Sequence, residues 1–200
     1  MAPVDFYFDF SSPYGYFAAC RVDELVGRQG REVAWHPILL GVVFEVTGGR
    51  PLPSQPLKGE YARIDIPRTA RLLGLPYRHP ARFPVSGQAG CRAFYWVQRD
   101  DPEAARALAR GLFDALFVSD RDIGDPAVVI EVAAAQGIDR AALAAALADP
   151  EVKALPRGAT ERAMQAGVFG SPFFVVDGEP FWGNDRLDQV IAQLQQTSAR

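Results

Sequence analysis

Strand-like segments occur only near the two ends of this 200-residue chain, and this distribution constrains the fold more than any other feature. Residues 4–10 (V-D-F-Y-F-D-F) are rich in β-favouring side chains, and residues 32–39 return to strand character after a helical pattern. Near the other end, residues 172–176 and 179–182 flank Asp177-Gly178, a dipeptide typical of a two-residue hairpin turn. Because the middle of the chain is helical in pattern, we expect its two ends to form one sheet.

The first two strands are predicted to be parallel. Ser11, Ser12 and Pro13 form a helix start, because a serine hydroxyl caps unpaired backbone N–H groups and proline suits the first helical turn. Apolar residues then recur at helical spacing as far as Gly30, which predicts one helix; they are Tyr14, Phe17, Ala18, Val22 and Leu25. The order strand, helix, strand favours a parallel βαβ unit.

Helical patterns fill the middle of the chain after a proline-rich loop at 51–56. The predicted helices are 58–73, 91–99, 102–118, one that begins at Asp125-Pro126, 139–149 and a short one at 159–166. A terminal helix is defined by Leu187, Val190, Ile191 and Leu194. The predicted fold class is α/β. Residues 1–50 and 167–200 form a thioredoxin-like domain, and residues 51–166 form an all-helical subdomain inserted between the βαβ unit and the C-terminal β-hairpin and helix.

Composition narrows the function classes. Hydrophobic residues make up 48% and charged residues 22% of the chain, as in ordinary globular proteins. The formal net charge of −3 provides no basic surface for a phosphate backbone, so we do not expect a nucleic-acid partner. No stretch approaches the ~20 apolar residues that span a bilayer, so we expect no membrane segment and a cytoplasmic location.

The potential metal ligands are few and scattered. The chain has two cysteines, Cys20 and Cys91, and two histidines, His36 and His79, without close spacing, so we predict no metal site. We interpret both cysteines as free, buried thiols. His36 alternates with Trp35 on the second strand and is interpreted as structural, whereas His79 lies in a turn-rich segment and is expected to be solvated.

A pocket is predicted where the first helix begins. In a thioredoxin-type fold this helix start faces the turn before the third strand, so Ser12 and Ser171 should meet, beside N–H groups that stabilise an anion. Redox proteins of this fold place a Cys-x-x-Cys there, but this chain reads Ser12-Pro13-Tyr14-Gly15, which excludes dithiol exchange by its own residues. The Ser12 hydroxyl either donates to a thiolate supplied by another molecule or only caps the helix.

Three segments together resemble the 2-hydroxychromene-2-carboxylate isomerases, which have a DsbA-like thioredoxin fold and are related to the kappa-class glutathione transferases. They are D-F-Y-F-D-F-S-S-P-Y-G-Y-F at the start, Leu57-Lys58-Gly59-Glu60-Tyr61 with Asp65 and Arg68, and G-V-F-G-S-P-F-F-V-V-D-G-E-P-F-W-G-N-D-R-L near the end. The resemblance covers essentially the whole chain. It implies glutathione as the cofactor, with Ser12 at its sulfur and with Ser171, ahead of a cis Pro172, pairing with its backbone.

The resemblance also implies the other binding residues. The W-G-N-D-R-L element matches Trp182, Gly183, Asn184, Asp185, Arg186 and Leu187. Its N–H groups can donate to the γ-glutamyl carboxylate, or Asp185 can pair with the ammonium; alternatively, Asn184 and Asp185 only cap the terminal helix. Lys58 would reach a glutathione or substrate carboxylate.

Four residues are expected on the substrate side. Arg50, with Lys58, would neutralise the substrate carboxylate, and Tyr14 is either a core residue or, being close to the helix cap, lines an aromatic pocket. Gly49 and Ser86 stand where the family often has asparagines, which puts one substrate hydrogen bond in doubt at Gly49 and gives Ser86 a shorter reach.

The function that the resemblance implies is a glutathione-dependent isomerase acting on an aromatic ring-fused carboxylic acid, of the 2-hydroxychromene-2-carboxylate type. The glutathione thiolate would add to the substrate and later be expelled. A kappa-type glutathione transferase is the close alternative, since it needs the same thiolate. A non-catalytic thioredoxin-fold module that binds peptides or proteins is an alternative of another class, and glutathione affinity distinguishes it. The family analogy also implies a homodimer.

Overall fold

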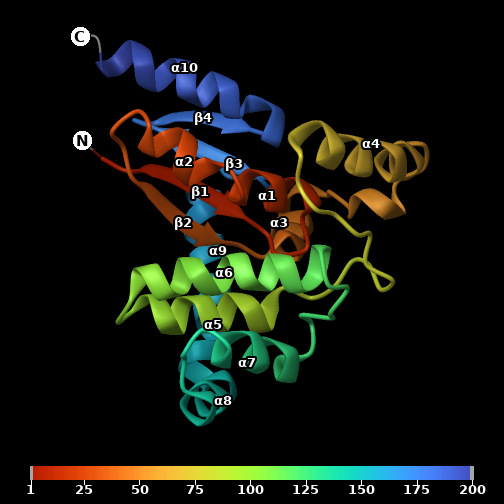
Figure 1. Ribbon diagram of the computed structural model, residues 1–200, viewed down its shortest axis with the longest axis vertical. Helices are drawn as coiled ribbons and strands as arrows, with labels where there is room; N and C mark the ends of the chain where they lie inside the picture. Colours follow the sequence, from red (N-terminus) through yellow and green to blue (C-terminus); the bar gives the residue numbers. More distant parts are fainter. Residues whose placement is uncertain (1, 199–200) are drawn as a thin grey trace.

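Four strands form one mixed sheet in the computed structural model, which describes residues 2–198. The strands are β1 (Val4–Phe8), β2 (Val33–Pro37), β3 (Phe173–Val176) and β4 (Glu179–Trp182), in the order β2-β1-β3-β4. β1 is parallel to β2 and antiparallel to β3, and β3 is antiparallel to β4. The sheet therefore joins the two ends of the chain, and the predicted parallel βαβ unit and hairpin are confirmed (Figure 1).

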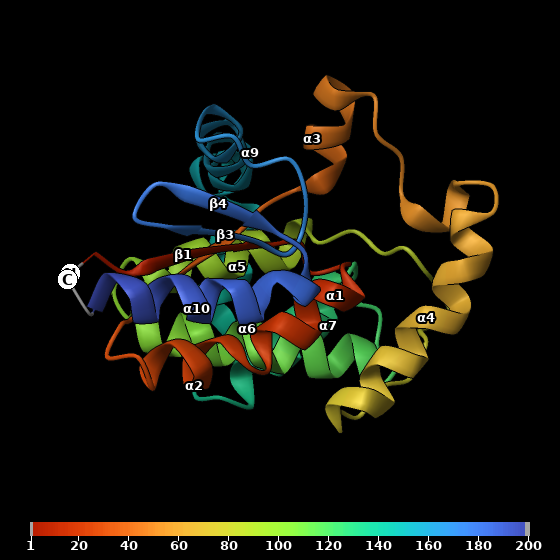
Figure 2. The same cartoon turned by 90° about the horizontal axis from the view of Figure 1, so that it is seen from above.

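The helices occupy both faces of this sheet and the long middle segment. They are α1 (Pro13–Ala19), α2 (Val22–Gly27), α3 (Leu40–Thr47), α4 (Lys58–Leu73), α5 (Gln88–Gln98), α6 (Pro102–Phe117), α7 (Pro126–Ala134), α8 (Arg140–Ala148), α9 (Pro150–Gln165) and α10 (Leu187–Ser198). Two short 3-10 turns are η1 (Leu52–Ser54) and η2 (Asn184–Arg186). Figure 2 shows α9 on the opposite side of the strands from α2 and α10.

Successive side chains along each strand point to opposite faces of the sheet, and each face has an apolar core. On one face of the sheet, Phe6 and Phe8 are fully buried and pack against Trp35 with ring centroids 5.1 and 5.4 Å away. The Phe8 ring also contacts Phe113 of α6 at 5.5 Å. On the other face, Phe173 belongs to a smaller buried cluster beside α3 and α9. These contacts fix the ends of β1 and β3, where the candidate site lies.

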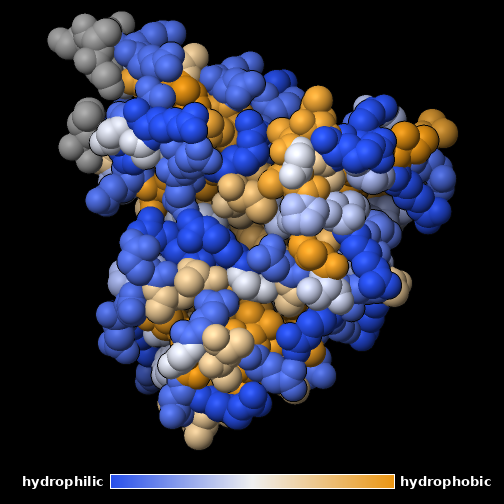
Figure 3. All heavy atoms as spheres, in the orientation of Figure 1, coloured by the Kyte–Doolittle hydropathy of each residue, from blue (hydrophilic) through white to orange (hydrophobic). Residues whose placement is uncertain are grey.

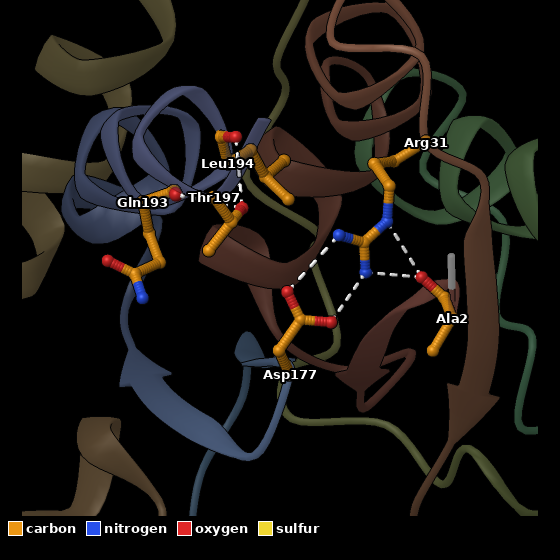
Figure 4. Close-up of polar contacts among 6 residues, drawn as sticks. All are labelled: Ala2, Arg31, Asp177, Gln193, Leu194 and Thr197. Atoms are coloured by element: carbon orange, nitrogen blue, oxygen red, sulfur yellow. Dashed lines mark hydrogen bonds and ion pairs between the residues drawn. The ribbon is translucent and has the colours of Figure 1, made fainter. Parts of the chain in front are cut away.

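A buried arginine ties the two ends of the chain together. The Arg31 side chain, 3% exposed, donates to both carboxylate oxygens of Asp177 in the β3–β4 turn, at 2.9 and 3.2 Å. Its Nε donates to the Ala2 carbonyl at 2.7 Å (Figure 4). The Arg31 hydrogen bonds hold the pKa of Asp177 below its usual range.

We expect Asp177→Asn to destabilise the fold, because it leaves the buried guanidinium without its counter-charge. Hydrogen bonds to charged groups contribute about 1.5–3 kcal/mol, and a loss of that size is expected at pH 7. Since the folded-state pKa of Asp177 is lowered, its contribution is present above the unfolded pKa and is lost as the pH falls through the folded one. Urea unfolding at pH 7 and pH 3 measures this; an equal difference between the two proteins at both pH values would contradict it.

Some predicted boundaries were wrong. The helix expected from Pro13 to Gly30 is split into α1 and α2 at Cys20 and Arg21, so that each half directs its own apolar side chains into the core. The loop before residue 51 contains α3, which the sequence patterns did not predict. The short helix expected at 159–166 is the end of α9, which begins at Pro150, with Asp149 capping it through the Glu151 N–H at 2.7 Å.

The cysteine and histidine interpretations were largely confirmed. Cys91 is buried, but Cys20 is exposed, which corrects the expectation of two buried thiols. His36 bonds to Asp5 at 2.8 Å as a structural residue, and His79 is exposed beside Tyr77.

Within residues 2–198, no helix is long and apolar enough to cross a membrane, and no three His, Cys, Asp or Glu side chains are grouped so that they could hold a metal ion.

Candidate functional site

The Ser12 hydroxyl lies at the start of α1 and makes two hydrogen bonds. It accepts from the backbone N–H of Gly15 at 3.0 Å and thereby caps the helix. It also donates to the backbone carbonyl of Ser171 at 3.2 Å. Ser12 is only 8% exposed. The predicted meeting of Ser12 and Ser171 is confirmed, and the hydroxyl that caps α1 also donates to the turn before β3.

The turn before β3 contains the cis peptide bond that the resemblance implies. The Ser171-Pro172 bond is cis. The Ser171 hydroxyl accepts from the backbone N–H of Asp9 at 2.9 Å, which fastens this turn to the end of β1. The Pro172 carbonyl accepts from the Gly183 N–H at 3.0 Å. Segments from three parts of the chain therefore converge on one point.

Gly15 permits this close approach. A Cβ atom added at Gly15 would lie 3.0 Å from the Ser171 Oγ and 3.1 Å from the Ser12 Cβ. Such distances are shorter than ordinary van der Waals contact, so a larger residue would push the two serines apart. Glycine at this position keeps Ser12 and Ser171 within hydrogen-bond distance.

The buried carboxylate of Asp9 holds the segments around Ser12 together. Asp9 accepts from the backbone N–H of Ser11 at 2.7 Å and from that of Leu40, the first residue of α3, at 2.8 Å. Burial raises the pKa of Asp9, and the two N–H groups act in the opposite direction because they favour the carboxylate. Ser11 in turn accepts from the Val85 N–H at 3.2 Å. The Ser11 hydroxyl is thus bonded to the segment before α5.

A second hydrogen-bond network joins α1 to α4. The Tyr14 hydroxyl donates to Asp65 at 2.5 Å, and Tyr61 and Arg68 donate to the other Asp65 oxygen at 3.1 and 2.5 Å. Although burial acts to raise the pKa of Asp65, the hydrogen bonds from Tyr14, Arg68 and Tyr61 hold it below its usual range. Burial and the Asp65 carboxylate both raise the pKa of Tyr14. The Tyr14 hydroxyl is therefore engaged by Asp65, and its ring packs edge-on against Phe17.

The turn after β4 lies against α1 and contains an unsatisfied polar atom. Gly183 has φ 116°, a conformation that favours glycine, and precedes η2, which contacts α1. The Oδ1 atom of Asn184 is buried and has no hydrogen-bond partner among the residues that the structure describes. The residue at the N-cap of η2 is Gly183, which has no side chain to form a cap bond, and the Asn184 Oδ1 caps no backbone N–H within residues 2–198.

Trp182 and Arg186 are held by neighbours. The Trp182 indole packs over Gly170, where an added Cβ would lie 2.3 Å from its Nε1, and its ring centroid is 4.9 Å from that of Phe169. Trp182 is 56% exposed and flanks the cis-proline turn. Arg186 forms an ion pair with its neighbour Asp185 at 3.1 Å. A ligand anion would therefore compete with Asp185 for this guanidinium.

The other predicted residues lie at the margin. Lys58 begins α4, the helix that contacts α1 through Asp65; it is exposed, and no ion pair is recorded for it within residues 2–198. Ser86 is exposed and follows Val85, which bonds to Ser11. Gly49 and Arg50 follow the far end of α3, about 12 Å along the helix from the Leu40 that bonds to Asp9. The structure does not place Gly49 and Arg50 beside Ser12.

Sequence reasoning missed Asp9, Gly15 and Gly170 as residues that shape the site. The signal for Asp9 was a charged side chain inside an otherwise apolar strand segment. The two glycines left no comparable signal, because their importance depends on Ser171 and Trp182, which approach them from distant parts of the chain. A second cis bond, Phe83-Pro84, was also not predicted.

Comparisons with known proteins agree with this geometry. The chain matches the model of the DSBA-like thioredoxin domain over residues 3–195. It is 32% identical over 194 residues to a 2-hydroxychromene-2-carboxylate isomerase of Sphingobium xenophagum, covering 96% of this chain and 97% of that protein. It is 26% identical over 206 residues to glutathione S-transferase kappa 1 of Caenorhabditis elegans, covering 96% and 91%.

A solved structure extends the similarity to three dimensions. A 2-hydroxychromene-2-carboxylate isomerase structure has a TM-score of 0.88 with this chain at 27% identity, covering 98% of this chain and 95% of the other. The similarity thus includes the inserted helices as well as the sheet. The chain therefore belongs to the DsbA-like thioredoxin family and, within it, to the 2-hydroxychromene-2-carboxylate isomerases, which are enzymes.

Proposed function

We propose that this chain is a glutathione-dependent isomerase of 2-hydroxychromene-2-carboxylate or a similar aromatic carboxylic acid. The observation that carries the proposal is the Ser12 hydroxyl, which is directed at the cis-proline turn with no cysteine beside it. A hydroxyl in this position is suited to a sulfur that comes from another molecule. The isomerase relatives support the reaction class.

The residues present fit glutathione. The buried Asn184 Oδ1 lacks a donor, which an ammonium or amide N–H of the tripeptide would supply. Lys58 is a cation without a recorded ion-pair partner in the described part of the chain, and it suits a carboxylate. The Ser171 carbonyl accepts a hydrogen bond from Ser12 at the relatively long distance of 3.2 Å, so a ligand N–H could replace that donor.

Ser12 has a defined task in this proposal. Bound glutathione supplies a thiolate, the nucleophile that the chain itself does not place here. When a ligand N–H takes over the Ser171 carbonyl, the Ser12 hydroxyl is released to donate to the sulfur while still capping α1 through Gly15. Lowering a thiol pKa by two units requires about 3 kcal/mol, which a charge-assisted hydrogen bond and nearby backbone N–H groups can provide.

The substrate would lie beside the sulfur. Lys58, and Arg50 if the segment after α3 moves inward, would neutralise the substrate carboxylate, and the Tyr14 ring and Ser86 would line the aromatic part. Gly49 sits beneath Phe44, because an added Cβ would lie 2.5 Å from that ring. An asparagine at this position would require Phe44 to move, so this chain is proposed to bind its substrate without that amide.

We also propose a cytoplasmic location. Cys20 and Cys91 are free thiols, as is usual where glutathione keeps the compartment reducing. Reduced glutathione is the form that the proposed reaction needs.

We expect glutathione to raise the melting temperature by about 5–10 °C. A ligand at one hundred times its dissociation constant stabilises the folded state by about 2.7 kcal/mol, and each kcal/mol shifts a chain of this size by about 2–4 °C. S-methylglutathione should give a smaller shift, because it presents no anionic sulfur to Ser12. Thermal unfolding with millimolar ligand measures both. An unchanged melting curve would favour the non-catalytic peptide-binding module.

The role of Lys58 can be tested in the same experiment, with Lys153 as the matched control. Lys58→Met should reduce the shift or raise KM for the acid, whereas Lys153→Met, at the other lysine, which is also exposed, should change neither. The kappa-type transferase is distinguished by incubation with an aryl halide. Conjugation of the halide without isomerisation of the carboxylate would favour the transferase, which the kappa relative supports as the second candidate.

A further inference from the structure

A cleft of about 550 Å³ lies between α4 and the segment that leads from α4 to α5. Figure 1 shows this segment descending from α4 toward α5. Pockets that hold small molecules commonly have volumes of about 300–1,000 Å³, so the cleft is large enough for one. Its walls include Arg63 and Pro67 of α4 and Tyr77, His79, Pro80 and Phe83 of the segment.

The cleft is separate from the site around Ser12. The buried face of α4 is centred on Ile66. Because successive residues of a helix are about 100° apart, Arg63 and Pro67 lie on one flank of this face and Asp65 lies on the other. Asp65 is the residue through which α4 bonds to α1 beside Ser12. The two flanks of α4 therefore face two different sites.

The cleft carries positive charge. Arg63 is exposed, and no ion pair is recorded for it within residues 2–198. Partial desolvation and the neighbouring Arg63 lower the pKa of His79, although Asp120 acts in the opposite direction. The Asp120 carboxylate is engaged by the Ala81 N–H at 2.8 Å and by Arg78 at 3.2 Å. An anion bound near Arg63 and His79 would relieve the repulsion between them.

The other walls of the cleft suit a flat aromatic ring. The rings of Tyr77 and Phe83 contact the His79 ring, with centroids 6.4 and 5.2 Å away. Tyr77 also stacks on Phe117 of α6 at 6.0 Å, which fixes this wall, and Pro67 adds a rigid apolar surface from α4. In Figure 3, hydrophobic and weakly polar side chains gather over the region between α4 and α6, with hydrophilic ones around them.

Tyr77 orients the His79 ring for an anion. The Tyr77 hydroxyl lies 2.9 Å from Nδ1 of His79. Burial raises the pKa of Tyr77, so it stays protonated at neutral pH and donates to Nδ1. The proton of the neutral imidazole is then on Nε2, which can donate to an anion. Since a hydroxyl also accepts, the contact persists when the ring takes up a second proton.

We propose that the cleft binds a small aromatic monoanion, an aryl carboxylate, with its charge at Arg63 and His79 and its ring against Tyr77, Phe83 and Pro67. This site is additional to the one around Ser12 and does not depend on glutathione. Binding takes up a proton at His79, because the anion favours the imidazolium. The affinity therefore rises as the pH falls through the pKa of His79, while the carboxylate stays ionised.

A fluorine NMR titration of the full chain with 4-fluorobenzoate tests the proposal. The expected dissociation constant at pH 6 is about 1 mM, as is reasonable for so small a ligand. Arg63→Met should raise it about tenfold or more, because a charge-assisted contact is lost. Arg82→Met is the matched control and should not change it, since this exposed arginine of the same segment pairs with Asp122 at 2.9 Å and does not line the cleft. Lys58→Met, on the other flank of α4, should also leave it unchanged.

The two histidines of the chain provide a second readout. Titration of their ring Hε1 signals with pH should show that 4-fluorobenzoate raises the pKa of His79. The His36 signal is the internal control and should be the same with and without the ligand, because His36 lies in β2 and bonds to Asp5. His79→Phe keeps an aromatic ring beside Phe83 and should remove the pH dependence of the affinity.

Four results would overturn the proposal. The first is no binding at millimolar ligand, and the second is equal affinity of the wild type and Arg63→Met. The third is a loss of binding in Lys58→Met alone, which would place the ligand at the site around Ser12. The fourth is equally tight binding of uncharged 4-fluorobenzyl alcohol, because the charge would then have no part in recognition. Equally effective displacement of 4-fluorobenzoate by cyclohexanecarboxylate would overturn the assignment of an aromatic ligand.

Discussion

Replacing Ser12 by alanine is expected to lower kcat about 10- to 100-fold while glutathione still binds. The proposed hydroxyl bond to the thiolate is charge-assisted, and such bonds contribute about 1.5–3 kcal/mol, which corresponds to this loss of rate. The tripeptide's carboxylates and amides are assigned to other residues, so its affinity should change little. Initial rates of isomerisation and a glutathione titration of the same sample measure both effects.

The control must separate catalysis from helix capping, because Ser12 also accepts from the Gly15 N–H. Loss of an N-cap costs about 1 kcal/mol of stability by itself. Asp139→Ala removes an equivalent cap from α8, where Asp139 accepts from Ala142 at 2.6 Å, far along the chain from the site. Ser11→Ala removes the bond to Val85. Both variants should lose stability and keep their rate; equal loss of rate at Ser11 and Ser12 would contradict the assignment of the sulfur to Ser12.

Much of the fold was predictable because its signals are local. The β-favouring side chains of β1, the serine and proline at the start of α1 and the Asp177-Gly178 turn are each local signals; the turn residues indeed have φ 50° and 90°. Helix α3 was not predictable in this way. Its sequence, L-G-V-V-F-E-V-T, is rich in β-branched residues, and its first N–H bonds to the side chain of Asp9, which is remote in sequence.

The residues of the candidate site also fall into two groups, those indicated by local sequence signals and those that depend on packing between remote segments. Ser12 was found because a cap motif can be recognised in sequence, and Ser171 because a thioredoxin-type fold places the turn before its third strand opposite that helix start. The Tyr14–Asp65 bond and the orphaned Asn184 oxygen required the structure, since each depends on how separate helices and turns pack. Gly49 and Arg50 were carried over by position in the chain, yet α3 takes them away from Ser12. Their sequence positions alone could not place Gly49 and Arg50 correctly, because the sequence pattern did not predict α3, the helix that precedes them.

Introducing cysteines at both Ser12 and Gly15 is expected to convert this site from redox-silent to redox-active. The wild-type protein should not catalyse insulin reduction, because neither Cys20 nor Cys91 lies at the start of α1. An added Cβ at Gly15 would lie 3.1 Å from the Ser12 Cβ, and disulfides need about 3.5–4.5 Å, so a small separation suffices. Backbone N–H groups at a helix start lower the pKa of a thiol there. The double variant should therefore form a disulfide in air and accelerate insulin reduction by dithiothreitol.

The single variant Ser12→Cys is the matched control, because it has the nucleophile but no resolving thiol at the helix start. Thiol titration should find two free cysteines in the oxidised double variant, as in the wild type, and three in the single variant.

Crowding at the Ser171 Oγ, 3.0 Å from the added Cβ, is the main obstacle to disulfide formation. Ser171→Ala in the double background removes it and should increase the rate if that contact limits disulfide formation. Four titratable thiols after air oxidation in both backgrounds would mean that the start of α1 does not bring positions 12 and 15 together as described. The prediction that the native site is redox-silent has its own test. Insulin reduction by a variant in which both Cys20 and Cys91 are replaced would contradict it, because that activity would then not depend on thiols at the start of α1.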